Sequence, residues 1–406
     1  MLANYPWLMW GIILGWTGLS IWLSNKTKLG RKLGYINLCI IGGFVLVNIK
    51  VVPQFCEQYS ILSNYFIPLA IVLMLFQANL KKLWKIYEKE QIEFINNFIQ
   101  ALSMQRLKDI GMNCGVEYTA FDFFSNIVPY SRYQHSIGVA LIVYHFTHDF
   151  KQATAGLLHD IATPVFAHTI DFYHQDYLKQ ESTELDTKKI IERDSSLVSL
   201  IHRYHLKIDD VCNYHLYPLC DNESPKLSAD RLEYTLGNMY SYGFCDFETI
   251  QTIYNDLKVN DTQDELIFKH EEMAILFTRM MLKCAHVYIC DEDRYAMQYL
   301  SYIIKKAVNK GVVTENDFYL QEKDFIHLLI KDNEIKRLWV SYQQLNCIYK
   351  GKNKNFFCKQ IPAKKRYIDV YVENKGRISK INEDINQEIQ TFLAIDLSEY
   401  LWGKCE

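Results

Sequence analysis

Three long apolar runs follow one another at the amino terminus, at about residues 7–23, 33–52 and 61–78. Each run is close to the roughly 20 residues that a helix needs to cross a bilayer. Lys and Arg cluster in residues 24–32 and again just after the third run, which predicts that both places face the cytoplasm. Residues 1–10 lack the basic start of a cleaved signal peptide. We therefore predict that residues 1–86 form a membrane segment with three transmembrane helices, followed by a cytoplasmic domain.

From Glu88 onward, apolar residues recur at helical spacing among charged and polar ones. Amphipathic stretches occur at about 136–150, 152–162, 187–205, 227–242, 264–290, 293–309 and 315–345. Alternation typical of strands is confined to residues 366–372 and 377–381, on either side of a turn that contains Gly376, and predicts a β-hairpin at about 366–381. The predicted fold class is therefore mainly α, with a helical core over residues 87–260. A helical carboxyl-terminal region over 261–406 carries the hairpin.

Composition and charge exclude several classes of protein. Hydrophobic residues make up 49% of the 406 residues, so a large core can form. The 11 Cys residues lack CxxC pairs and a close, even spacing, and in a chain this long they indicate reduced thiols of a cytosolic protein. The net charge of only −3 argues against a protein that mainly coats nucleic acid, so nucleic acid is not indicated as a partner.

Four short segments carry His and Asp side chains that suit a metal ion. They are 132–136 (RYQHS), 157–160 (LLHD), 164–168 (PVFAH) and 230–234 (DRLEY). Imidazole and carboxylate together suit Mn, Fe, Ni or Zn, and carboxylate tolerates Mg. Adjacent His159 and Asp160 can bind one ion only if their helix bends or ends there, and Pro164 predicts such a break. Both follow an apolar helix, where bare polar groups are costly unless they are paired or metal-bound.

These segments contain R-x-x-H-S-x-G-V, L-L-H-D-I, P-x-F-x-H and D-x-x-x-Y, and they resemble the motifs of the HD superfamily of metal-dependent phosphohydrolases. Their order and spacing are most similar to its deoxynucleoside-triphosphate triphosphohydrolase branch. The resemblance covers about residues 90–382, including a lead-in at 105–111 and a segment at 364–369. It implies an HD-domain helical bundle in which a divalent ion (Mn, Mg, Fe, Ni or Zn) is held by His135, His159, Asp160 and Asp230.

The same resemblance implies roles for the residues around the ion. Arg132 would contact substrate phosphate or sugar with its planar donor fork, and Tyr234 would lie against the sugar. From the residues alone, a surface ion pair for Arg132 and a core position for Tyr234 are equally good interpretations. His168 would line the site and contact phosphate or a second ion. Asn238 aligns with an acidic position that faces the sugar in the branch.

The chain departs from the branch at two positions that carry His. The usual motif H-D-x-G-H-x-P-F-S-H reads H-D-I-A-T-P-V-F-A-H at residues 159–168, so Thr163 replaces the middle His. A further His of the branch has no clear equivalent, because residues 181–184 read E-S-T-E. Threonine has no useful proton affinity near neutral pH, and our hypothesis is that Glu181 or Glu184 takes over the acid role.

The leading hypothesis is a phosphohydrolase that cleaves a nucleotide or another small phosphoester with metal-activated water. The alternative is a regulatory module with weak catalysis that binds metal and nucleotide, because the acid–base groups differ. A transporter fragment with a regulatory domain ranks last, since three spans are too few for a typical carrier. The resemblance to the branch also implies symmetric homo-oligomeric assembly.

The first 85 residues carry a second resemblance. The segments at 23–34 (LSNKTKLGRKLG) and 64–85 (NYFIPLAIVLMLFQANLKKLWK) resemble the start of DUF819, a family of multi-pass bacterial membrane proteins. Members of that family continue through many more spans than this chain has, so transport is not implied. An anchor in the lipid bilayer, the relic of a gene fusion and a join between two reading frames all stay open as interpretations.

Overall fold

The computed structural model describes residues 6–27, isolated positions between 38 and 52, and residues 83–87, 93–175 and 186–404. The chain divides into two compact units, Met1–Ala78 and Asn79–Glu406. In the first unit, helix α1 (Pro6–Lys26) covers the first predicted span. The second predicted span lies mostly, and the third wholly, outside the described residues. The domain boundaries near residues 86 and 260 stay predictions.

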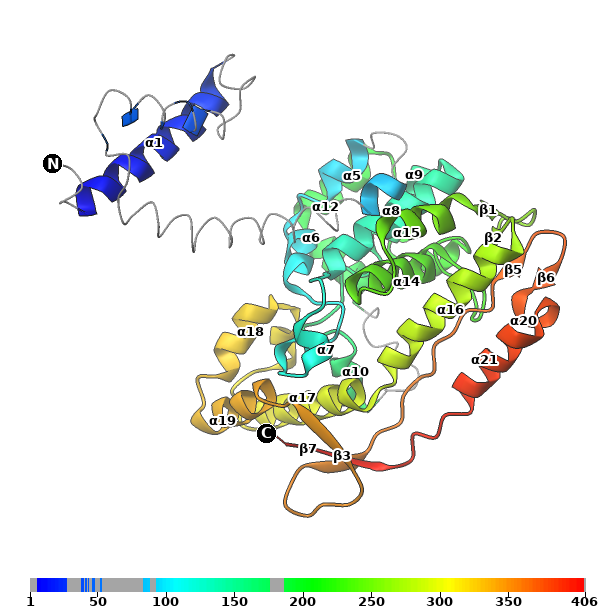
Figure 1. Ribbon diagram of the computed structural model, residues 1–406. Coiled ribbons are helices and arrows are strands. Elements are labelled where there is room, and N and C mark those ends of the chain that lie inside the picture. The colour runs from blue at the N-terminus through cyan, green and yellow to red at the C-terminus, as the bar shows by residue number, and fades with distance from the viewer. Residues whose placement is uncertain are drawn as a thin grey trace. The chain divides into compact units, whose positions relative to one another are not determined.

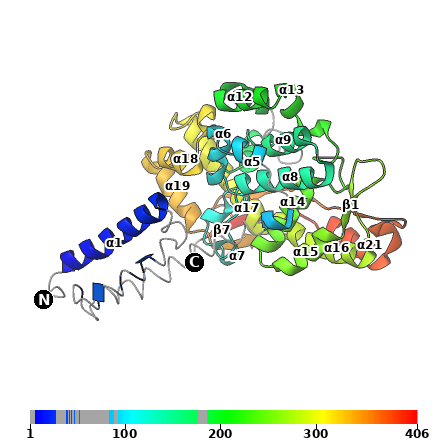
Figure 2. The same cartoon turned by 90° about the horizontal axis from the view of Figure 1, so that it is seen from above.

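Three helices, α8 (Arg132–Thr147), α9 (Phe150–Leu158) and α14 (Ala229–Ser241), form the centre of the second unit (Figures 1 and 2). Each begins at a polar side chain, Ser131, Asp149 or Ser228, that accepts hydrogen bonds from backbone N–H groups of the first turn. Most of α8 is buried, because α9 packs against it on one side and α14 on another. The fold is mainly helical, as the sequence predicted.

Further helices surround these three. They are α5 (Glu93–Phe98), α6 (Leu102–Arg106), α7 (Asp122–Ser125), α10 (Thr169–His174), α11 (Thr187–Arg193), α12 (Ser195–Arg203), α13 (Ile208–Val211), α15 (Phe247–Asn255) and the 3-10 helices η3 (Leu107–Asp109), η4 (Val116–Tyr118) and η5 (Tyr214–Leu216). The helix predicted over 187–205 is in fact two helices. Asp194 ends α11, and its carboxylate caps α12 by accepting from two backbone N–H groups.

The carboxyl-terminal part is built on α16 (Glu271–Tyr288) and α17 (Asp291–Asn309), with a bend of 42° between them. This bent pair together has the length and hydropathy of a membrane span, and no single helix in the described part of the chain has both. Helix α21 (Glu383–Leu393) packs along α16 (Figure 1). The stretch predicted as continuous helix over 315–345 is divided into η6 (Glu315–Tyr319), α18 (Glu322–Leu329) and α19 (Asn333–Gln343).

Two small sheets complete the second unit, with the strand orders β1–β2–β5–β6 and β3–β7–β4. The strands are β1 (Leu257–Val259), β2 (Leu266–Phe268), β3 (Cys347–Lys350), β4 (Cys358–Gln360), β5 (Tyr371–Val372), β6 (Gly376–Arg377) and β7 (Tyr400–Lys404). The sequence predicted only the β5–β6 pair, because strands this short carry too little alternation to be recognised. Strand β2 takes the first residues of the stretch that was predicted to be helical over 264–290.

The predicted hairpin at 366–381 is present but shorter than expected. Strands β5 and β6 pair antiparallel, with Tyr371 opposite Arg377. The prediction of a strand beyond Arg377 was wrong, because Ile378–Ile381 forms the one-turn helix α20. Asp369 favours this turn, since its carboxylate accepts hydrogen bonds from the Ser379 backbone N–H at 3.0 Å and from the Ser379 hydroxyl at 2.7 Å.

Candidate metal centre

The ends of the three central helices bring the predicted metal ligands together. His135 lies in the first turn of α8, and Asp230 lies in the first turn of α14. His159 follows the last residue of α9, and Asp160 lies in the turn beyond it. The helix therefore ends at the place where the sequence predicted a break. This ending lets the adjacent His159 and Asp160 side chains face the same point.

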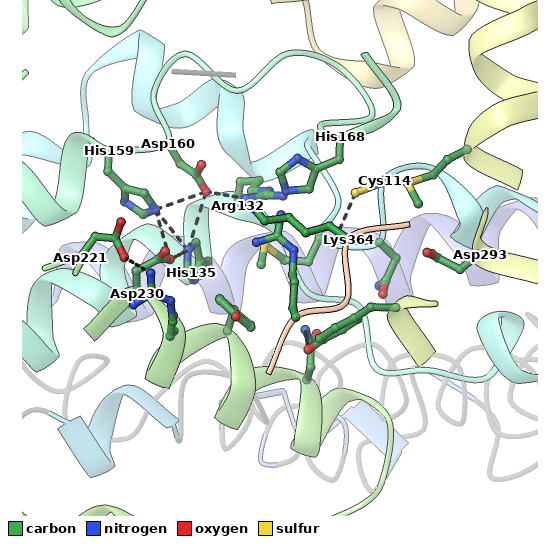
Figure 3. Close-up of a pocket in the computed structure, with 18 of the residues that line it drawn as sticks. Cys114, Arg132, His135, His159, Asp160, His168, Asp221, Asp230, Asp293 and Lys364 are labelled. Atoms are coloured by element: carbon green, nitrogen blue, oxygen red, sulfur yellow. Dashed lines mark hydrogen bonds and ion pairs between the residues drawn. The ribbon is translucent and has the colours of Figure 1, made fainter. Parts of the chain in front are cut away.

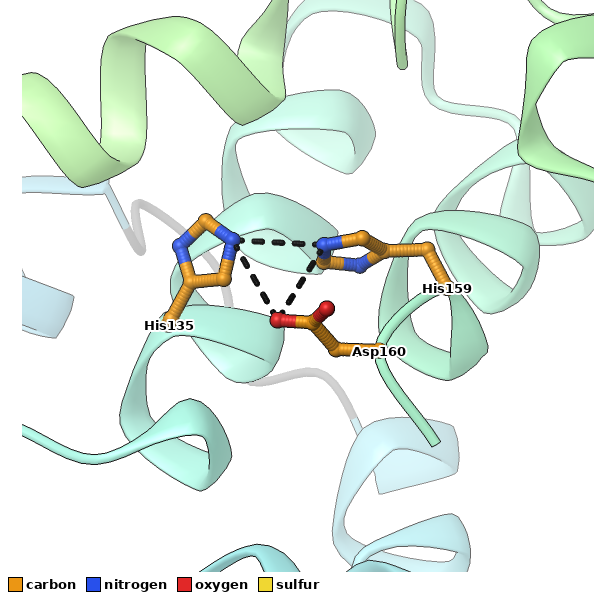
Figure 4. A group of neighbouring side chains, drawn as sticks. All are labelled: His135, His159 and Asp160. Carbon is orange, nitrogen blue, oxygen red and sulfur yellow. Dashed lines mark hydrogen bonds and ion pairs between the residues drawn. The ribbon is translucent and has the colours of Figure 1, made fainter. Parts of the chain in front are cut away.

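The four side chains converge (Figure 3), and Figure 4 shows three of them, His135, His159 and Asp160, in close-up. The Nε2 atoms of His135 and His159 are 3.2 Å apart, and Asp160 Oδ2 lies 3.8 and 3.6 Å from them. Asp230 Oδ1 lies 3.0 and 3.7 Å from the same two nitrogens. Two donor atoms that are each about 2.1 Å from a shared ion lie about 3.0–3.5 Å apart. The measured separations of 3.0–3.8 Å lie within or slightly above this range, and His135, His159 and Asp160 form a compact group of donors that could hold one metal ion, with Asp230 beside both imidazoles.

Both imidazole rings are held so that Nε2 points to this centre. His159 Nδ1 donates to the carbonyl oxygen of Gly156 at 2.7 Å, and His135 Nδ1 donates to Glu233 Oε2 at 2.6 Å. A hydrogen bond from Nδ1 fixes the tautomer and leaves the Nε2 lone pair for a metal. The sequence-based prediction missed Glu233. Its position three residues after Asp230 on the same helix was the signal that could have found it.

Glu233 is enclosed by residues that fit closely around it. Its side chain is 1% exposed, and its Oε2 also accepts a hydrogen bond from the Tyr130 hydroxyl. A Cβ atom at Gly138 would lie 2.2 Å from Glu233 Oε1, and one at Gly237 would lie 2.5 Å from the Tyr130 ring. Glycine at these two positions lets α8 and α14 approach closely enough for the chain of contacts from Tyr130 through Glu233 to His135.

Opposite charges dominate the electrostatics of the centre. Burial favours the neutral form of Asp160, but the Arg132 guanidinium at 2.9 Å and the two imidazoles outweigh burial and lower the pKa of Asp160. Burial likewise opposes ionisation of Asp230, yet its contact with His135 lowers the pKa of Asp230 to about 2. Both carboxylates are therefore charged at neutral pH, as ligands of a divalent ion must be.

Thr163, at the position where the branch has a His, has a structural partner. Its hydroxyl donates to Asp160 Oδ1 at 2.8 Å, and its side chain is buried. The Arg106 guanidinium fixes the same turn by donating to the carbonyl oxygens of Ile161 and Thr163, at 2.9 and 2.7 Å. Thr163 therefore orients a candidate ligand, and a hydroxyl bound in this way supplies no proton near neutral pH.

A cavity of about 570 Å³ opens beside the four candidate ligands. The other predicted site residues that the structure describes, Arg132, His168, Tyr234 and Asn238, all line it. His168 Nδ1 donates to the buried Asp171 at 2.8 Å, and burial lowers the pKa of His168. The predicted acids Glu181 and Glu184 lie outside the described residues. The cavity also contains cationic side chains that were not predicted, including Lys364 and Arg366.

Comparison with protein families gives two separate matches. Residues 132–218 match the HD domain, and residues 11–101 match the protein of unknown function DUF819. The HD match covers His135, His159 and Asp160 but ends before Asp230. Each match covers less than half of the chain.

Three relatives extend these matches. The uncharacterized protein YdhJ of Bacillus subtilis (strain 168) is 25% identical over 261 residues, which are 63% of this chain and 78% of that protein. The uncharacterized membrane protein YjcL of the same organism is 33% identical over 89 residues, 22% of each chain. The metal-dependent phosphohydrolase cns2 of Cordyceps militaris is 27% identical over 202 residues, which are 48% of this chain and 56% of that protein.

Two solved structures share the fold. A hypothetical protein from Aquifex aeolicus has a TM-score of 0.57 and 16% identity, and the match covers 78% of this chain and 93% of that one. A phosphohydrolase from Bacteroides thetaiotaomicron VPI-5482 has a TM-score of 0.52 and 15% identity, with 79% and 96% covered. The chain thus carries an HD domain with a cluster of two His and one Asp, after an amino-terminal segment that matches DUF819.

Proposed function

We propose that the protein is a metal-dependent phosphohydrolase that acts on a nucleotide or another small phosphoester. The observation that carries the proposal is the convergence of two imidazole nitrogens and two carboxylate oxygens beside a cavity of about 570 Å³. Small-molecule sites occupy about 300–1,000 Å³, so the cavity suits such a substrate. The match to the HD domain and the similarity to cns2 support the same class of activity.

The proposed metal ligands are His135, His159, Asp160 and Asp230. Their donor set suits Mn, Fe, Ni or Zn and tolerates Mg. When bound, such an ion supplies Lewis acidity, which neutralises phosphate charge and lowers the pKa of a coordinated water.

Two residues of the cavity wall have proposed roles toward the substrate. Arg132 uses Nη1 for Asp160, and its buried Nε has no partner among the described residues, so the guanidinium retains donor capacity for a phosphate oxygen. His168 is oriented by Asp171, and burial lowers the pKa of His168, which favours the neutral imidazole before substrate binds. The negative charge of a bound phosphate would raise its pKa, and the imidazolium would then give its Nε2 proton to the leaving oxygen.

One observation supports a regulatory module as the second candidate. The hydroxyl of Thr163 is engaged with Asp160, so no proton-transfer group stands where the branch carries its middle His. A chain of this kind would bind metal and nucleotide but turn over slowly. Bound metal without turnover on any substrate would select this candidate.

We further propose that residues 1–85 attach the HD domain to the membrane with the domain in the cytoplasm. The apolar runs and flanking basic residues support this, as do the DUF819 match and the similarity to YjcL. Alkaline carbonate extraction of membranes tests the attachment, and protease added to intact and to lysed cells tests the orientation. Release by carbonate would indicate a peripheral protein, and cleavage of the HD domain in intact cells would contradict the cytoplasmic orientation.

The test of the enzymatic proposal uses the full chain purified in detergent. Phosphate release from nucleotides and generic phosphoesters would be measured with Mn, Mg, Fe, Ni and Zn. We expect metal-dependent turnover that is lost in His159→Ala and Asp160→Ala. His174→Ala is the matched control, because His174 is exposed and does not line the cavity. Turnover that survives both ligand substitutions would refute the assignment of the site.

A further inference from the structure

The cavity has a second polar end, away from the metal centre. Figure 3 shows Asp293 on the opposite side of the cavity from His159 and Asp230. Asp293 lies in the first turn of α17, and Asn238, on α14, also lines the cavity. Asp293 lies outside the segments that resemble the HD motifs, whereas Asn238 follows the D-x-x-x-Y segment on α14. The two ends are therefore separate groups of side chains in one cavity.

Asp293 is a buried acid whose carboxylate has no hydrogen-bond or ion-pair partner among the described residues, although the charge of Arg294 acts on it. The residue is 9% exposed. The neighbouring cation does not pair with it, because the Arg294 guanidinium donates to the carbonyl oxygens of Ile289 and Ile361 and to Asp291. Burial, followed by the nearby negative charge of Glu117, raises the pKa of Asp293 well above its usual range. A buried carboxyl without a partner costs free energy, which native structures tolerate mainly at functional sites.

Asn238 adds a second unsatisfied acceptor. Its Nδ2 donates to the Tyr288 hydroxyl at 2.8 Å. Its Oδ1 is buried and has no hydrogen-bond partner among the described residues. The orphaned groups of Asn238 and Asp293 thus both offer oxygen acceptors, and Asp293 accepts through its carbonyl oxygen even when it is protonated.

The wall of the cavity also includes aromatic and apolar side chains. Tyr234, Tyr242, Tyr288, Phe172 and Met297 line the same cavity. The hydroxyl of Tyr242 donates to Asn113 Oδ1 at 2.8 Å. Because this hydrogen bond occupies the hydroxyl proton, Tyr242 presents an apolar ring face to the cavity rather than a free donor. Flat apolar walls with a few polar groups at one end suit a planar ring that carries hydrogen-bond donors.

We propose that Asp293 and Asn238 form a recognition subsite for an amino-substituted planar ring in the organic part of the substrate, whose N–H groups they accept. This inference rests on the proposed function in one respect: it assumes that the phosphate of the substrate lies at the end of the cavity that contains the metal centre. An N–H donor supplies what both acceptors lack, whereas a ring with acceptors alone can take only the O–H of a protonated Asp293 and leaves the acceptor oxygens unpaired. Discrimination against such a ring follows, because a polar site rejects a ligand that leaves buried groups unsatisfied.

The test compares two nucleosides that differ in a single amino group, adenosine and purine riboside. Neither carries phosphate, so binding is measured independently of hydrolysis. Calorimetric titration of the metal-loaded full chain should show adenosine binding about tenfold or more tightly than purine riboside, the difference expected for one hydrogen bond to a buried acceptor. Asp293→Ala should remove this preference, and Asp293→Asn, which keeps an acceptor oxygen, should restore part of it.

Asp291→Asn is the matched control. Asp291 lies on the same turn of α17, is paired with Arg294 and does not line the cavity, so this variant should keep the preference. Removal of an unpartnered buried acid should also leave the melting temperature of Asp293→Asn unchanged or raise it. Equal affinity of the wild type for the two nucleosides, no binding of either one, or a preference that survives Asp293→Ala would overturn the subsite. The proposed phosphohydrolase activity would not be affected by these results, because it is tested by metal-dependent phosphate release. Conversely, a protein that prefers adenosine but releases no phosphate would refute the proposed enzyme and leave the subsite standing.

Discussion

Replacing Glu233 with Gln tests whether the metal centre depends on the orientation of His135. Glu233 Oε2 accepts hydrogen bonds from His135 Nδ1 at 2.6 Å and from the Tyr130 hydroxyl, in a side chain that is 1% exposed. Glutamine keeps the shape of the side chain but removes its charge. It also places an N–H donor on one branch, next to groups that are themselves donors.

The expected magnitude follows from the contacts. A hydrogen bond to a charged group contributes about 1.5–3 kcal/mol. Because about 1.4 kcal/mol corresponds to a factor of ten, loss of the charge at Glu233 should weaken metal binding by about 10- to 100-fold. His135 would remain a ligand, since its Nε2 is unchanged, so binding should be weakened rather than abolished.

The assay is calorimetric titration of the metal-stripped full chain with the ion found in the purified protein. Glu322→Gln is the matched control, because Glu322 is also 1% exposed and accepts hydrogen bonds from the backbone N–H groups of Gly111 and Phe166. Burial raises the pKa of Glu322 to about 8, so its carboxyl is already mostly neutral at pH 7 and glutamine should leave metal affinity unchanged. Wild-type affinity in Glu233→Gln, with the protein folded, would refute the positioning role of Glu233.

Three further predictions address the same site. Thr163→Val removes the hydroxyl that donates to Asp160 Oδ1 at 2.8 Å, and should weaken metal binding about tenfold in the same titration; unchanged binding would contradict its role. His168→Gln should lower kcat by about 10²- to 10⁴-fold in phosphate-release assays while metal content stays constant. Burial opposes protonation of His135, but its contacts with Asp230 and Glu233 raise the pKa of His135 in the metal-free chain to about 10. This imidazolium stabilises the metal-free fold fully below its unfolded pKa of about 6.5, and the contribution is lost as pH rises through about 10. Melting curves should show that loss, and metal binding at pH 7 should release about one proton, measurable by calorimetry in buffers of different ionisation enthalpy; a stability that rises over this pH range would contradict the assignment.

The candidate ligands could be predicted because the His and Asp residues that suit a metal ion lie in short, recognisable sequence segments. The pair His159 and Asp160 follows an apolar helix, and Pro164 marks the break that the structure places there. The helical class and most of the long helices were predictable for a similar reason, since 3.6-residue periodicity persists over many residues.

The remaining features depend on contacts between distant segments. Glu233 acquires its role only because two glycines let α8 and α14 approach each other, and Asp293 reaches the cavity from a helix that carries none of the motifs. Apart from β5 and β6, the strands of the two sheets escaped prediction because they are short, and some pair across long separations, as in the antiparallel pairing of β3 with β7. The turn at Ile378–Ile381 was wrongly predicted as a strand, because the side-chain bonds of Asp369 that favour the helical turn are not visible in a local pattern.

The central claim is that His135, His159, Asp160 and Asp230 hold one divalent ion. The most direct test is the metal content of the purified full chain, measured by mass spectrometry for the wild type and for Asp160→Ala and Asp230→Ala, with folding verified by circular dichroism. The account predicts about one ion per chain in the wild type, the stoichiometry of a single site with four protein ligands, and a near-complete loss in both folded variants. A wild-type protein that retains no Mn, Mg, Fe, Ni or Zn after loading, or folded variants that retain the ion in full, would contradict it.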